Sequence, residues 1–154
     1  KSQFAFTDPY VEDKQLIVVQ KGSDIKTKAD LEGKIVGIQA GSSAIEAVKK
    51  DAATYESIGE MVEFGGNDEA LLDLATGRLD AVVVDEVVGR YYIAKKPGEY
   101  EILDEDFGKE EFGVGLRLGD KAFLAEMNRV LDEMKADGTA AEISDKWFGD
   151  DITK

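Results

Sequence analysis

Lys34-Ile-Val-Gly-Ile-Gln-Ala-Gly-Ser-Ser-Ala44 is the stretch around which the rest of this chain can be interpreted. Its first half is apolar and predicts a buried strand, and Gly37 predicts a place where another part of the chain packs closely. Gly41 permits a sharp turn after the strand. Ser42 or Ser43 can then cap a helix that begins at once. The stretch therefore predicts a strand, a glycine turn and the first turn of a helix.

The turn from Gln39 to Ser43 carries the first candidate site. It offers backbone N–H groups and two hydroxyls at the positive end of a helix dipole, an arrangement that binds a carboxylate or a phosphate. The same residues also fit an ordinary capped turn without a ligand. The local sequence leaves both interpretations open.

Composition narrows the classes of function. The 154 residues include 43% apolar and 34% charged residues, which is typical of a soluble globular protein with one domain or two small lobes. A formal net charge of −14 argues against nucleic-acid binding, which depends on Lys and Arg. Histidine and cysteine are both absent, so we expect no disulfide, no metal site, no cofactor and no hydrolytic triad. No apolar run is long enough to span a bilayer.

Because the chain opens on Lys1, we expect a processed precursor.

Short strands alternate with helices along the chain. We expect strands near residues 4–6, 16–19, 35–39, 61–64, 79–84, 101–103 (at a sheet edge) and 112–116. We expect helices near residues 28–33, 42–53, 67–76, 87–95, 120–136 and 139–149. The helix over 120–136 has an apolar face at residues 123, 124, 127, 130, 131 and 134. This alternation predicts an α/β fold with a largely parallel sheet.

Asp85 is the second candidate site residue. It follows the apolar strand 79–84, and ligands of such sheets bind at the carboxyl ends of the strands. The Gln39–Ser43 turn offers donors to an anion and Asp85 offers a carboxylate to a cation, so an α-amino acid would satisfy both. Alternatively, Asp85 only caps the helix that follows. A carboxylate has two oxygens, so both roles can coexist.

The order of motifs resembles the amino-acid-binding family 3 of extracellular solute-binding proteins, which serve ABC importers. The matching segments are residues 6–10 (FTDPY), 31–43 (LEGKIVGIQAGSS), 74–85 (LATGRLDAVVVD), 112–117 (FGVGLR), 135–139 (KADGT) and 146–149 (KWFG). They run through nearly the whole chain in the order and spacing of the family.

The resemblance implies a type 2 periplasmic-binding-protein-like α/β fold, in which two lobes joined by hinge strands close on the ligand. It assigns residues 1–20 to a first-lobe remnant and hinge strand, 21–110 to a complete second lobe, and 111–154 to the second hinge strand and the C-terminal helices of the first lobe. It implies a ligand-binding set for the ligand's carboxylate, side chain and ammonium: Gln39, Gly41, Ser42, Ser43 and Asp85. Asp85 would pair with the ammonium.

The function implied by the resemblance is capture of a polar L-amino acid without chemistry, for the membrane subunits of an ABC importer. The expected location is periplasmic or extracellular, with a lipid anchor in the precursor left open. The chain lacks the first βα units of the family's first lobe, together with an aromatic residue and an arginine that hold the ligand. The C-terminal helices then lack core partners, so we expect a homo-oligomer, a swapped dimer or a rearranged remnant. We expect Trp147 to pack in a core or between the lobes.

Two other functions occur on the same fold. One is a cyclohexadienyl (prephenate or arogenate) dehydratase, for which Asp85 and Glu86 are the only paired carboxylates at a strand end. Adjacent residues at a helix start point apart, so we expect no enzyme. The other is the ligand-sensing domain of a receptor, and no linker is evident after residue 149. Glutamine, glutamate, cystine and arginine all remain open as ligands. We expect selectivity to depend on the absent first-lobe residues and on Gln39, Ala44 and Val84.

Overall fold

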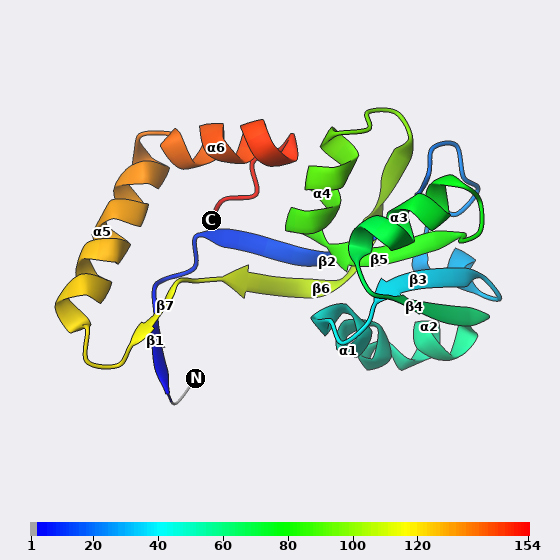
Figure 1. The fold of residues 1–154 in the computed structure, drawn as a ribbon, viewed down its shortest axis with the longest axis horizontal. Helices are drawn as coiled ribbons and strands as arrows, with labels where there is room; N and C mark the ends of the chain where they lie inside the picture. The colour runs from blue at the N-terminus through cyan, green and yellow to red at the C-terminus, as the bar shows by residue number, and fades with distance from the viewer. Residues whose placement is uncertain (1–2) are drawn as a thin grey trace. The chain divides into compact units, whose positions relative to one another are not determined.

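The computed structural model describes residues 3–154 and divides the chain into two compact units (Figure 1). Unit 1 is Lys1–Asp13 with Glu110–Lys154, and unit 2 is Lys14–Lys109. Both boundaries fall inside strands, because β2 covers Val11–Gln20 and β6 covers Tyr100–Phe112. The lobe limits expected from the sequence stay predictions, and Lys1 and Ser2 lie outside the described residues.

The sheet of unit 2 has five strands in the order β4-β3-β5-β2-β6. Its other strands are β3 (Ile35–Gln39), β4 (Glu60–Phe64) and β5 (Ala81–Asp85). Strand β3 pairs in parallel with β4 and with β5, whereas β2 pairs antiparallel with β5. The sheet is therefore mixed, and the expectation of a largely parallel sheet was wrong at β2. The segment between β2 and β3 contains only the short 3-10 helix η1 (Lys28–Leu31) and not the α-helix that usually forms a parallel crossover.

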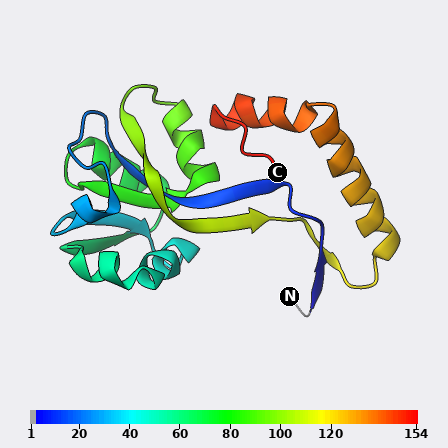
Figure 2. The ribbon, with the colours of Figure 1, turned by 180° about the vertical axis from the view of Figure 1, so that it is seen from behind.

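Helices cover both faces of this sheet, as Figures 1 and 2 show. Helix α1 (Ser43–Lys50) packs on one face, and α3 (Asn67–Ala75) and α4 (Glu86–Ala94) pack on the other. Strand β2 contributes alternate residues to the two apolar clusters: Ile17 and Val19 face α1, and Leu16 and Val18 face α3. Because all four are almost fully buried, β2 is an interior strand.

The helix expected over 42–53 is two helices, α1 and α2 (Ala52–Ser57). Asp51 separates them, because its backbone ends α1 while its side chain accepts a hydrogen bond of 3.3 Å from the Thr54 N–H at the start of α2. Aspartate favours such capping positions over a helix interior.

Unit 1 contains a two-stranded antiparallel sheet of β1 (Phe4–Phe6) and β7 (Gly115–Arg117), followed by α5 (Lys121–Ala136) and α6 (Thr139–Phe148). The expected strands 101–103 and 112–116 are divided differently, since β6 runs on through Phe112 and β7 begins at Gly115. Reciprocal hydrogen bonds of 3.0 Å join Asp8 to Asn128 and attach α5 to the segment before β2.

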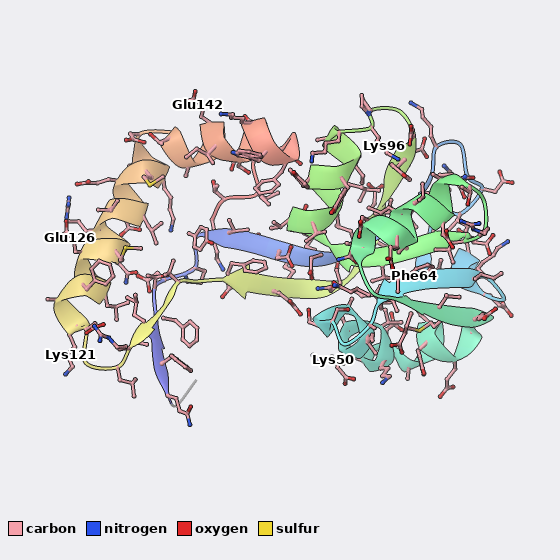
Figure 3. All side chains as sticks on the ribbon, viewed as in Figure 1. Lys50, Phe64, Lys96, Lys121, Glu126 and Glu142 are labelled. Atoms are coloured by element: carbon pink, nitrogen blue, oxygen red, sulfur yellow. The ribbon has the colours of Figure 1, made fainter. Side chains whose placement is uncertain are left out.

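Unit 1 leaves much apolar surface uncovered within the described part of the chain. Helix α5 has no buried residue, and its side chains, around the labelled Lys121 and Glu126, are drawn in Figure 3. Eight exposed large apolar side chains belong to this unit: Phe4, Phe6, Phe112, Leu118, Phe123, Val130, Ile143 and Trp147. Trp147 is 51% exposed, so the expectation of a core position was wrong within the described residues, and packing against the other lobe stays a prediction. Among residues 3–154, no helix has the length and apolar character needed to cross a membrane.

Candidate functional site

The parallel pairing of β3 with β5 brings the ends of two strands together at one edge of the sheet. The register aligns Val36 with Ala81 and Ile38 with Val83, so Gln39 ends β3 beside the end of β5 at Asp85. Strand β5 is followed directly by α4, and β3 is followed by the turn at Gly41 and then by α1. Two of the elements predicted to carry ligand-binding residues are therefore neighbours, both within unit 2.

The turn after β3 has the backbone that the sequence predicts. Gly41 has a φ of +68°, a conformation that disfavours any side chain, and Ser42 occupies the N-cap position of α1. The expected capping bond is absent at Ser42, because its Oγ donates instead to the Gln39 carbonyl oxygen at 2.8 Å. The first-turn N–H groups of a helix have no intrahelical acceptor, and here no Ser42 side chain satisfies them. The helix start is therefore suited to an anion.

Asp85 occupies the N-cap position of α4 but makes no side-chain bond to the helix. Its Oδ1 instead accepts a hydrogen bond from Gln15 Nε2. The interpretation of Asp85 as a simple helix cap thus accounts for its position but not for its side chain, which is half-buried. The carboxylate retains a second oxygen, Oδ2, for another partner.

Gln15 contacts two of the candidate site residues, although it was not singled out from the sequence. It lies on β2 directly opposite Asp85 in the antiparallel register, and it is fully buried. Its Nε2 also lies 3.4 Å from Ser43 Oγ, so one amide connects the first residue of α1 with the last residue of β5. The strand pattern does indicate that Gln15 faces inward. Side chains alternate along a strand, and Gln15 shares its face with the buried Ile17 and Val19.

Gln39 is held by the neighbouring turn after β4. Its Oε1 accepts a hydrogen bond of 3.0 Å from Asn67 Nδ2, and its Nε2 donates to the Gly65 carbonyl at 3.5 Å. Gly66 occupies the N-cap position of α3, and Asn67 is the first helical residue. Ser43 and Asp85 are thus connected through Gln15, whereas Gln39 is bonded to Asn67 and Gly65.

Two residues expected to set selectivity are inaccessible. Ala44 packs in the cluster under α1 and Val84 packs in the cluster under α3 and α4, with exposed fractions of 3% and 1%. The expectation was wrong for both, because their methyl groups complete the two cores. Gln39 is the member of that set that remains partly exposed.

Glu86 has a partner of its own. It is 4% exposed, and Arg90, one helical turn later, donates from Nε to Glu86 Oε1 at 2.8 Å. The Glu86 carboxylate is thus bonded to a guanidinium of its own helix. This geometry does not supply the paired acid that a dehydratase would need beside Asp85.

Comparison with known proteins identifies the family that the chain resembles. The family model of bacterial extracellular solute-binding proteins, family 3, matches residues 1–150. The L-cystine-binding protein of Escherichia coli is 33% identical over 161 residues, which cover 100% of this chain and 57% of that protein. The ABC transporter arginine-binding protein 1 of the same organism is 30% identical over 150 residues, covering 95% and 60%.

A solved structure shows the same fold. It is an ABC uptake transporter substrate binding protein from Streptococcus pneumoniae with bound histidine, with a TM-score of 0.79 and 31% identity. The likeness covers 98% of this chain and 63% of that one. This chain thus spans about three fifths of the length of the proteins it matches. The periplasmic-binding-protein-like α/β fold class is confirmed, and the chain belongs to the bacterial extracellular solute-binding proteins, family 3.

Proposed function

We propose that this chain is part of the substrate-binding component of an ABC amino-acid importer and binds a polar L-amino acid. The observation that carries the proposal is the connection of Ser43 to Asp85 through Gln15. Through this connection, a helix start suited to an anion lies near a carboxylate suited to a cation. An α-amino acid carries a carboxylate and an ammonium on one carbon and so matches both groups. Relatives named for cystine and arginine, and a neighbour with bound histidine, support a ligand of this class.

The assigned residues have distinct roles in this proposal. Ser42, Ser43 and the backbone at Gly41 hold the ligand's carboxylate or side chain. Asp85 pairs with the ammonium through Oδ2, and Gln39, the partly exposed member, contacts the ligand's side chain.

The properties of the whole protein are part of the same proposal. Residues 21–110 form the second lobe, the flanking segments belong to the first lobe and its hinge strands, and the membrane subunits of an importer are the partners. The protein is located outside the cytoplasmic membrane, and its precursor either carries a lipid anchor or is released. The family supports this location, since its members are extracellular solute-binding proteins. Binding occurs without chemistry, and the pairing of Glu86 with Arg90 supports that part.

A thermal-shift screen against the twenty amino acids, cystine and prephenate tests the proposal. A ligand at a hundred times its dissociation constant stabilises a protein by about 2.7 kcal/mol, which is readily detected. We expect a response to one amino-acid class that disappears in Asp85→Ala. A response to prephenate alone, or to no compound, would contradict the proposal.

Asp80→Ala is the matched control for that screen. Asp80 lies just before β5, and its Oδ2 accepts a hydrogen bond of 2.8 Å from the Ile35 N–H at the other end of the sheet. The variant loses a carboxylate with a structural contact. We expect a lower melting temperature with the ligand-induced shift retained.

We also propose that this 154-residue chain self-associates through unit 1. The exposed apolar side chains of β1, α5 and α6 support this, since exposed apolar side chains that gather on one surface are typical of an interaction site. Size-exclusion chromatography with light scattering should give a mass above that of one chain. Lysine at Leu118 and Phe123, which are 56% and 54% exposed, should restore the single-chain mass. A monomeric parent chain would refute self-association.

A further inference from the structure

The Gln15 amide makes contacts that packing alone does not require. It comes from β2, an element that carries none of the predicted ligand residues, and it reaches Asp85 Oδ1 and Ser43 Oγ from one nitrogen. All three residues belong to unit 2. The amide therefore couples the two βα turns of the candidate site.

The orientation of this amide follows from the chemistry of its neighbour. A carboxylate only accepts hydrogen bonds, so the amide nitrogen of Gln15 must face Asp85 and the oxygen must point elsewhere. That oxygen, Oε1, is buried and has no hydrogen-bond partner among the described residues. A buried acceptor without a partner lowers the stability of a fold.

An apolar side chain of similar length would avoid this cost in stability. Gln15 thus combines an unfavourable buried oxygen with two contacts to candidate ligand residues. This combination is typical of positions that serve function at the expense of stability.

We propose that Gln15 is a positioning residue of the amino-acid site, an inference that rests on the proposed function. Its hydrogen bond to Oδ1 fixes the plane of the Asp85 carboxylate, so that Oδ2 is held for the ligand's ammonium. Its contact with Ser43 Oγ holds the hydroxyl at the start of α1. Gln15 acts through these two residues and does not itself contact the ligand.

Gln15→Met is the variant that separates function from stability, because methionine has a similar length but no amide. Gln20→Met is its matched control. Gln20 lies on the same strand, and its Nε2 donates one hydrogen bond of 2.9 Å to the Ala75 carbonyl, away from Asp85. L-cystine, L-arginine, L-histidine and L-glutamine serve as probes in calorimetric titrations, with thermal unfolding measured in parallel.

We expect Gln15→Met to weaken binding of the responding probe at least tenfold while its melting temperature stays at or above that of the parent. Gln20→Met should lower the melting temperature and leave affinity unchanged. In an Asp85→Ala background, Gln15→Met should cause a smaller loss of affinity than in the parent, because its contact with Asp85 is already gone and only the contact with Ser43 remains. Unchanged affinity in Gln15→Met, or loss of affinity only in proportion to loss of stability, would overturn the inference.

A measurement without ligand keeps the inference distinct from the proposed function. If the parent chain binds none of the probes, the proposed function fails, and the side-chain amide protons of Gln15 in an NMR spectrum decide the positioning role. We expect these protons to exchange slowly with solvent in the parent and faster in Asp85→Ala. Equal exchange rates in the two proteins would show that Gln15 does not fix the orientation of the Asp85 carboxylate.

Discussion

Asn67 Nδ2 donates a hydrogen bond of 3.0 Å to Gln39 Oε1, joining the first residue of α3 to the last residue of β3. Two turns at the same edge of the sheet are thereby connected by side chains. The orientation of Gln39 depends on Asn67, which lies in a part of the chain that the sequence analysis did not assign to the site.

Asn67→Ala should therefore change ligand selectivity. Without the Asn67 donor, Gln39 keeps only its 3.5 Å hydrogen bond to the Gly65 carbonyl and is held less firmly. We expect the protein to discriminate less among polar amino acids and its free energy of unfolding to drop by about 1 kcal/mol. Calorimetric titration with several amino acids measures the first effect. Thr76→Ala is the control, since Thr76 Oγ1 donates to the Asp73 carbonyl at 3.0 Å at the other end of α3. If both variants alter selectivity equally, Asn67 has no specific role.

Gly41→Ala should weaken both stability and binding. Its φ of +68° makes any side chain unfavourable by about 1 to 2 kcal/mol. Gly77→Ala is a matched control, because Gly77 has a φ of +76° after α3, and an added Cβ would lie in open space at both glycines. Chemical denaturation should show similar losses of stability in the two variants. Only Gly41→Ala should lose affinity, and equal affinities would remove Gly41 from the site.

Gly37→Ala should destabilise the core of unit 2. A Cβ at this position would lie 2.5 Å from Leu79 Cδ1 and 3.3 Å from Phe64 Cε2. Overpacking of this kind costs about 1 to 3 kcal/mol, measurable as a shift in the urea midpoint. The close packing expected at Gly37 from the sequence is thus confirmed. Leu79→Ala should relieve part of the loss in the double variant, and strictly additive losses would show that Leu79 is not the obstacle.

Asp51 should make stability depend on pH in the acid range. Its pKa is lowered chiefly by the hydrogen bond from the Lys28 ammonium, 2.9 Å away, and by the Thr54 N–H. A carboxyl group with a lowered folded-state pKa stabilises the fold fully above its ordinary pKa of about 4, and this contribution disappears as the pH falls through the lower value. Asp51→Ala should thus cost about 1 kcal/mol at pH 7 and less at pH 3, measured by urea unfolding.

Lys28→Met is the companion variant for Asp51. It removes the ion pair but leaves the cap of α2 intact, so we expect a smaller loss at pH 7 than for Asp51→Ala. The same loss at pH 3 and pH 7 for Asp51→Ala would contradict a role of the charged carboxylate.

The sequence was sufficient where local chemistry decides the structure. The strand before Gln39, the turn at Gly41 and the helix after Asp85 all depend on neighbouring residues, and they form where expected. The antiparallel direction of β2 and the burial of Gln15 depend on pairing with β5, some seventy residues later in the chain. Periodicity within one strand identifies an inward-facing residue but not the partner that it meets.

The hydrogen-bond partners of the Ser42 and Asp85 side chains could not be predicted from the sequence either. Both residues occupy helix starts as predicted, yet neither side chain caps its helix. A serine or aspartate at such a position can bond to the helix or to another group, and the choice depends on which acceptor or donor lies nearby. At Asp85 that donor comes from β2.

The interior position of β2 has a consequence for how this protein can be divided. A fragment that begins at residue 21 would omit a strand that both apolar clusters share, and would leave the edge of β5 with unpaired backbone groups. Such a fragment exposes a ready template for strand addition and is expected to aggregate. A fragment cut at 14–109 retains β2 from Lys14 onward and should be the smaller autonomous folding unit.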